Sequence, residues 1–149
     1  MNTSVEAFLS EADEALVVDA IREAETQTSG EIRVHIENHT LQNVSVEERT
    51  KQVFHFLKMD TTKAQNGVLV YVAVNLKQFW IYGDQGIHQK VGNDFWNSTR
   101  DVMLASFKHA KYCEGLTKGI LQIGTQLQAH FPWEADDENE LPNEISKGL

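Results

Sequence analysis

The sequence predicts a single α/β domain, folded as a three-layer αβα sandwich whose mixed central sheet is flanked by helices on both faces. Three observations lead to this prediction. A continuous apolar run, Val68–Val74, is typical of a central strand that is covered on both faces. Segment Glu31–Glu37 alternates between apolar and polar residues as a strand does, and helical stripes precede, separate and follow these strands. At 149 residues the chain fits one domain, which we assign to residues 1–133, with an acidic tail at 134–149.

The first predicted elements are a helix and a strand. Ser10 begins the helix as its cap, Asp13 stands at the capping-box position, and apolar residues follow at helical spacing up to Ala24. Gly30 is expected to end this helical region in a left-handed conformation. In Glu31–Glu37, aliphatic residues alternate with arginine, histidine and glutamate, so one face of this strand is expected to be wet or only partly covered.

The middle of the chain predicts a second helix and a hairpin. The helix spans Val44–Met59, and a polar loop, Asp60–Asn66, follows it. The short connection between Val68–Val74 and Gln78–Tyr82 predicts that these two strands are antiparallel neighbours. Gly83–Asn93 contains three glycines and is expected to be a loop.

Two helices and the tail complete the chain. Asn93 or Asp94 is expected to cap a helix that runs to about Ala110, and a last helix starts near Glu114 and is stopped by Pro132. Three glycines on the last helix predict close packing against the sheet or a neighbouring helix. The tail has little apolar material, so we expect it to be mobile and disordered.

The charge distribution argues against nucleic-acid binding. The tail has six acids and one base, which gives −5 of the total charge of −9, and the body carries the remaining −4. Neither part has the basic stripe that phosphate backbones require. The single cysteine, Cys113, excludes an internal disulfide. No apolar run is long enough to cross a bilayer and no signal peptide is recognisable, so we expect a cytoplasmic protein with no membrane partner.

The acidic loop after the third predicted strand is the best candidate for a functional site. Asp84 and Asp94 lie there among glycines, on a segment that can bend tightly. Hard cations such as calcium take six to eight oxygen ligands, so two acids are too few and distant acids must contribute. Glu31, which begins the first strand, and Glu114, which stands between the last two helices, are the candidates for completing the site.

Other interpretations of these residues stay open. A loop aspartate beside glycine commonly makes only turn or cap hydrogen bonds, and the spacing of an EF-hand is absent. Six histidines are present, but no pair has the spacing of a zinc site. Cys113 begins a helix, where a thiolate could be stabilised, yet a small buried role is the more common one.

Several segments, in this order, resemble the TPM domain family. They are Phe8–Asp13, Ala20–Ile21, Ala24–Glu25, Thr28–Val34, Asn66–Ala73, Gly83–Ile87, Val91–Gly92 with Asp94, and Phe107 with Tyr112 and Gly115–Leu116. The resemblance implies a four-stranded sheet, whose fourth strand we expect in Asp60–Asn66 or Ile87–Val91. It also implies binding of a divalent cation, calcium above all and magnesium or others as alternatives, by acidic loop residues. Asp84, Asp94, Glu31 and Glu114 are the matching positions here.

The resemblance leads to two functional hypotheses and a structural alternative. The first is a cation-responsive regulatory or interaction module, with divalent cations and a protein as its partners. The second is a metal-dependent phosphatase acting on phosphomonoesters, because some family members are acid phosphatases. The alternative is a scaffold whose acids only cap helices. The chain differs from many relatives in reading Gly-Asp-Gln-Gly at the glycine loop and in lacking a recognisable membrane helix.

Overall fold

A computed structural model describes residues 4–92, 94–134 and 140–148, and its centre is a four-stranded sheet in the order β3-β2-β1-β4. Strand β1 (Glu31–Glu37) runs parallel to both β2 (Gly67–Ala73) and β4 (Ser146–Lys147). Strand β3 (Gln78–Gly83) is antiparallel to β2 over six residue pairs. The sheet is therefore mixed, and the predicted antiparallel hairpin is confirmed.

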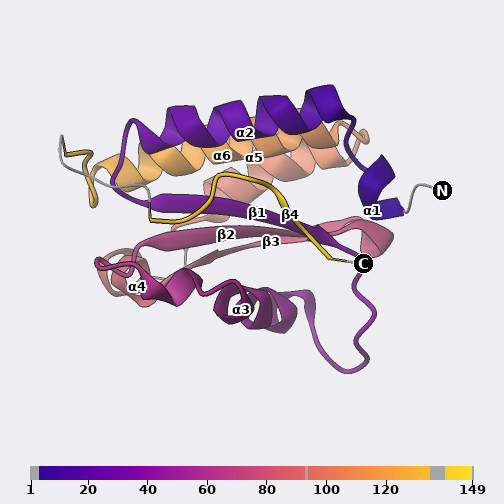
Figure 1. The fold of residues 1–149 in the computed structure, drawn as a ribbon, viewed down its shortest axis with the longest axis horizontal. Helices are drawn as coiled ribbons and strands as arrows, with labels where there is room; N and C mark the ends of the chain where they lie inside the picture. The colour runs from indigo at the N-terminus through magenta and orange to yellow at the C-terminus, as the bar shows by residue number, and fades with distance from the viewer. Residues whose placement is uncertain (1–3, 93, 135–139, 149) are drawn as a thin grey trace.

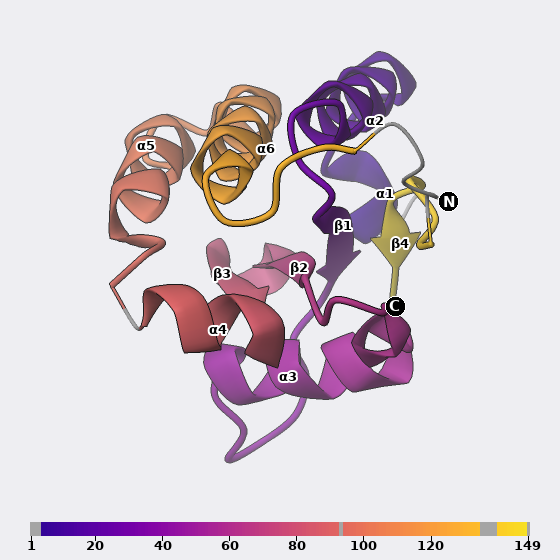
Figure 2. The same ribbon diagram turned by 90° about the vertical axis from the view of Figure 1, so that its left-hand side faces the viewer.

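Helices cover both faces of this sheet. Helices α2 (Glu11–Glu25), α5 (Asn97–Phe107) and α6 (Tyr112–Gln128) pack on one face, and α3 (Val46–Phe56) and α4 (Gln85–Val91) lie on the other (Figures 1 and 2). A short N-terminal helix, α1 (Ser4–Ala7), and two 3₁₀ turns, Met59–Thr61 and Val74–Leu76, complete the regular structure. This arrangement confirms the predicted three-layer αβα sandwich. Among the described helices, none is long and apolar enough to cross a membrane.

The face under α2, α5 and α6 carries the main aliphatic core. Side chains from β1 and β2 on this face are valine or isoleucine with at most 1% exposure. Glycines bring the covering helices close together, since a Cβ on Gly119 would lie 2.5 Å from the sulfur of Met103. A Cβ on Gly124 would lie 2.8 Å from that of Ala24. The predicted close packing of the last helix is therefore confirmed.

The face under α3 contains buried polar groups, which corrects one prediction. The polar side of β1 is covered rather than wet, because His35 and Glu37 are each only 5% exposed. Glu37 accepts hydrogen bonds from the Tyr71 hydroxyl at 2.6 Å and from Arg49 Nε at 2.7 Å. Alternation along a strand indicates which residues share a face, but it does not show that a distant arginine will neutralise that face.

The C-terminal segment supplies the fourth strand, which corrects two predictions. Neither loop expected to contain it does so, because the strand is Ser146–Lys147 at the edge of β1. Residues 140–148 are not a disordered tail: Leu141 is 6% exposed, Gly148 N donates to Ile36 O, and Lys147 pairs with Glu14 at 2.8 Å. Residues 135–139 lie outside the described residues. The acidic composition of the tail predicted that it is mobile. A strand of two residues is too short to show a hydrophobic pattern that would have indicated otherwise.

Two local predictions at glycines also differ from the structure. Gly30 does not adopt a positive φ. A Cβ there would lie 2.8 Å from Leu127 Cδ1, so the glycine allows α6 to approach. The predicted loop Gly83–Asn93 contains α4, which Asp84 caps and which ends at Gly92 with φ 78°. Asn93 itself lies outside the described residues.

Candidate functional site

One end of the sheet brings together two of the four predicted site residues. β1 begins at Glu31, which is the register partner of Gly67 at the start of β2. β3 finishes at the same end of the sheet, where the Asp84 amide donates a hydrogen bond to Gly67 O at 2.9 Å. Glu31 and Asp84 therefore flank Gly67 from its two sides. Parallel and antiparallel pairing together place these distant acids at one end of the sheet.

Asp84 is a buried carboxylate with one unsatisfied oxygen. Asp84 is only 5% exposed and is the N-cap residue of α4. Its Oδ1 accepts a hydrogen bond from the Gln85 amide at 2.7 Å. Oδ2 is buried and has no hydrogen-bond partner among the described residues. Burial raises the pKa of Asp84, and the neighbouring Asp60 carboxylate raises it further. The Gln85 amide and His55 act in the opposite direction.

Backbone oxygens lie against the helix that Asp84 caps. Gly86, in the first turn of α4, packs so tightly on the preceding loop that a Cβ would collide with the carbonyl oxygens of Ala64 and Gln65. Asp60, on the same side, is paired with His55 at 3.1 Å. The environment of Asp84 therefore contains carbonyl and carboxylate oxygens, which are the donors that hard cations prefer.

Glu31 is held in a second carboxyl cluster at the same end of the sheet. It is 3% exposed, and its Oε1 accepts the Glu140 amide at 2.6 Å. Glu25 lies beside it and accepts the Ile32 amide at 3.0 Å. Burial, together with the nearby Glu31 carboxylate, raises the pKa of Glu25 to about 8. Burial and the neighbouring carboxylate therefore both favour the neutral form of Glu25.

Asp94 lies in the connection from α4 to α5, towards the same end of α6 as Glu31, because the carbonyl of the next residue, Phe95, accepts a hydrogen bond from Gln126 and Leu127 contacts Gly30. Asp94 is exposed and lines a cavity beside β3, described below. The expectation that it caps the following helix is wrong, because the N-cap of α5 is Trp96 and only the Asp94 carbonyl is used, accepting the Asn97 amide at 3.1 Å.

Glu114 is separated from the other three acids by the length of α6. It stands in the first turn of that helix, bonded to Lys118 Nζ at 3.2 Å and to Ser106 Oγ at 3.3 Å. The bond to Lys118 lowers its pKa. Leu127, which contacts Gly30, is 13 residues farther along, so Glu114 lies about 20 Å from the Glu31 end of the sheet.

No preassembled metal cluster is found in residues 4–92, 94–134 and 140–148. No three histidine, cysteine, aspartate or glutamate side chains there are placed to hold one ion. The Cys113 thiol also gives no sign of activation, since burial and then Asp13 raise its pKa. The carboxylate that acts on Asp84 electrostatically is Asp60, whereas Glu31 lies at the same end of the sheet on the other side of β2.

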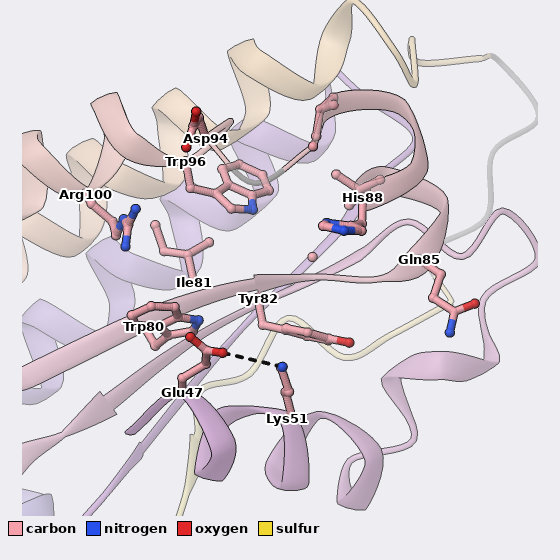
Figure 3. A pocket seen from close by; sticks show the side chains of 14 residues that line it. Glu47, Lys51, Trp80, Ile81, Tyr82, Gln85, His88, Asp94, Trp96 and Arg100 are labelled. Atoms are coloured by element: carbon pink, nitrogen blue, oxygen red, sulfur yellow. Dashed lines mark ion pairs between the residues drawn. The ribbon is translucent and has the colours of Figure 1, made fainter. Parts of the chain in front are cut away.

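A cavity of about 690 Å³ lies beside β3, between α3, α4 and the start of α5 (Figure 3). Its lining combines aromatic rings with charged groups of both signs. The Arg100 guanidinium lies 5.3 Å from the centroid of the Trp80 ring, and Lys51 pairs with Glu47 at 3.5 Å. Asp94 lines the same cavity, so a carboxylate and two cationic side chains share one space.

The buried network around Glu37 was not predicted as a unit. His35 Nε2 bonds to Glu37 Oε1, and His35 Nδ1 to Ser146 Oγ, each at 2.8 Å. Burial alone would raise the pKa of Glu37, but hydrogen bonds from His35, Arg49 and Tyr71 lower it well below its usual range. The polar residues of β1 were the only local pattern in the sequence that could have indicated this network. Their partners come from α3, β2 and the C-terminal segment, which no local pattern connects.

Comparison with known proteins gives a consistent classification. The model of the TPM domain matches residues 3–126. The BA42 protein of the psychrophilic bacterium Bizionia argentinensis is 52% identical, with a TM-score of 0.90 over 97% of this chain and 98% of that one. No curated protein matches the chain.

More distant solved structures share the fold. The N-terminal domain of a protein from P. gingivalis is 19% identical, with a TM-score of 0.64 over 83% of this chain and 79% of that one. The N-terminal domain of cg2496 from Corynebacterium glutamicum is 12% identical, with a TM-score of 0.61 over 95% and 80%. The sandwich architecture, the family match and the extensive identity with BA42 lead to one conclusion: the chain belongs to the TPM domain family.

Proposed function

We propose that the chain is a divalent-cation-binding module, with calcium as its ion and Asp84 as the central ligand. The observation that carries this proposal is the buried Asp84 Oδ2, which has no hydrogen-bond partner in the described part of the chain. Leaving a buried acceptor unsatisfied costs roughly 1–3 kcal/mol, and more for a charged group. A bound cation would supply the missing partner and keep the carboxylate ionised despite its burial.

The remaining ligands would come from oxygens at the same end of the sheet. Glu31 flanks Gly67 opposite Asp84, and the carbonyls of Ala64 and Gln65 lie against α4. Together with water, such a mixture of oxygens suits calcium, which tolerates variable geometry better than magnesium does. Asp94 and Glu114 stay outside this set.

Binding would connect the start of β1, the loop before β2 and the first turn of α4. These segments come from three parts of the sequence, so a cation would fix their relative positions. This is the physical basis for a regulatory role, because a partner that contacts α4 would encounter a more rigid surface when calcium is bound.

The proposal predicts a cation response that depends on Asp84. Calcium should shift the amide NMR signals of residues 84–87, 64–66 and 30–31, and it should raise the melting temperature as its concentration increases. Binding to the folded state alone stabilises by about 2.7 kcal/mol at 100 times Kd. Asp84→Asn keeps a good helix cap but replaces Oδ2 by a donor, so it should abolish the response.

Asp19→Asn is the matched control, because the Asp19 side chain is 70% exposed on α2 and the variant should respond as the native protein does. The proposal fails if neither calcium, magnesium nor another divalent ion at millimolar concentration changes the spectrum. It also fails if Asp84→Asn responds normally.

A metal-dependent phosphatase is the second candidate, and the cavity beside β3 favours it. Asp94, Lys51 and Arg100 line this cavity together, so a carboxylate lies near two groups able to bind a phosphoryl oxygen. This hypothesis predicts turnover of p-nitrophenyl phosphate with calcium or magnesium, lost in Asp94→Asn and in Asp84→Asn. Absence of turnover in the native protein, or full turnover in both variants, contradicts it.

A further inference from the structure

The outer strand β3 presents an open edge. It pairs with β2 over six consecutive residue pairs in regular register, and within the described residues β2 is its only strand neighbour. Figure 2 shows β3 at the border of the sheet, with α5 on one side and α3 on the other. At the opposite border β4 is the outer strand, and it pairs with β1 at two residues. An edge strand exposes unpaired amide and carbonyl groups that can pair with another chain.

A groove follows this edge. The cavity of about 690 Å³ beside β3 and a second cavity of about 690 Å³ share Glu47, Trp80 and Arg100 in their linings, so they lie next to each other along the strand, and we call them together the groove. The second cavity extends the groove to Leu76, at the turn before β3, and to Leu104 on α5. The groove therefore runs along the strand rather than across it, as an added strand would require.

The side chains of the groove change in character along its length. At one end Leu76 and Leu104 are 43% and 52% exposed and line the same cavity, so they leave apolar surface in contact with water there. Towards the other end the lining becomes aromatic, with Trp80 and Trp96 flanking Arg100 (Figure 3). Aromatic rings beside an arginine are typical of the most strongly contributing residues of protein interfaces.

The charge of the groove differs from that of the rest of the molecule. Lys51, Lys77 and Arg100 contribute +3 and Glu47 and Asp94 contribute −2, so the lining sums to +1. The whole chain carries −9, and the remainder therefore carries −10. A partner with basic side chains would be attracted to the remaining surface, whereas a partner with carboxylates matches the groove alone.

We propose that the groove binds an extended segment of a partner protein, apolar with acidic side chains, which adds to the sheet as a fifth strand beside β3. Its main chain pairs with the open edge. Its apolar side chains cover Leu76 and Leu104, and a carboxylate reaches Arg100 or Lys51. This is strand addition, in which backbone hydrogen bonds give affinity and side-chain contacts give specificity. The proposal does not depend on a bound cation.

The test uses three synthetic peptides and the ¹⁵N-labelled full chain. The first is a blocked nine-residue peptide of alternating valine and threonine, with two threonines replaced by glutamate. The second has lysine in place of the glutamates. The third has the sequence of the first with alternate amides N-methylated, so that it cannot pair along one edge. The first should shift the amides of residues 78–83 and the indole signals of Trp80 and Trp96, and bind more tightly than the other two.

A charge reversal locates the carboxylate contact. Arg100→Glu should weaken binding of the glutamate peptide by about fivefold or more, and it should improve binding of the lysine peptide. Lys108→Glu is the control, because this exposed lysine lies at the end of the same helix outside the groove. Melting curves of both variants establish that they fold.

Four results would overturn the proposal. They are no shift at millimolar peptide, equal binding of the N-methylated peptide, equal binding of the lysine peptide, and β3 signals that move with protein concentration when no peptide is present. The last would identify a second copy of this chain as the occupant of the edge.

Discussion

At the scale of single residues, the buried carboxyl groups respond differently to burial because their neighbours differ. Glu37 is surrounded by donors from His35, Arg49 and Tyr71, so its pKa is lowered. Glu25 has one amide donor and a neighbouring carboxylate, so its pKa is raised to about 8. Burial disfavours ionisation in both places, and the number of donors around each group decides the outcome.

Glu25 should make the stability of the protein fall as the pH rises from about 5 to about 9. Because the pKa of Glu25 is about 8 in the folded protein and 4.5 for a free side chain, its stabilising contribution is fully present below pH 4.5. That contribution is lost as the pH passes through 8. Glu25→Gln keeps an acceptor for the Ile32 amide without ionising, so it should be more stable than the native protein at about pH 9. Urea unfolding at the two pH values measures this, with Glu23→Gln as the exposed control. Identical pH dependence in Glu25→Gln and the native protein would contradict the assignment.

At the scale of elements, short segments with weak patterns decide the arrangement around the candidate site. Helix α4 has seven residues, begins at the Asp84 cap and ends at Gly92. Strand β4 has two residues and belongs to the C-terminal segment that lies along β1. In this segment the Gly148 amide donates to Ile36 O and Lys147 pairs with Glu14. Neither is long enough to show a recognisable periodicity, yet both are held by contacts with distant parts of the chain.

The C-terminal segment should contribute measurably to stability through Leu141. This side chain is 6% exposed in the cluster beneath α3, so Leu141→Ala should lower the free energy of unfolding by about 2–3 kcal/mol. Leu16, which is 54% exposed on α2, is the matched control, and Leu16→Ala should change it by less than about 0.5 kcal/mol. Denaturant unfolding checks both values. An equally small effect at both positions would indicate that the segment is not packed in solution.

At the scale of the whole molecule, the sheet separates two candidate surfaces. The end where β1 and β2 begin carries the acids Asp84 and Glu31, whereas the open edge of β3 carries the groove with Arg100. The first surface suits a cation and the second suits a peptide with carboxylates. Helix α4 connects the two surfaces, because Asp84 caps it and its side chains line the groove. Cation binding and peptide binding can therefore be measured one at a time and then in the presence of each other.

The sequence alone determined the elements whose patterns are long or chemically distinctive. The apolar run of β2, the alternation in β1 and the capping box at Ser10 and Asp13 predicted the sandwich and most of its elements correctly. Asp84 could be selected because an acid among glycines after a strand is a recognisable local pattern. Each of these signals lies within a few residues of the structure it predicts.

Only the tertiary structure decided which distant groups meet. It placed Glu31 and Asp84 at the same end of the sheet. It placed Glu114 in the first turn of α6, at the other end of that helix from Glu31. It showed Glu37 neutralised by Arg49, and the acidic C-terminal segment packed as a strand. The physical reason is that burial and charge compensation depend on partners many residues away, whereas periodicity and capping depend only on neighbours in the chain.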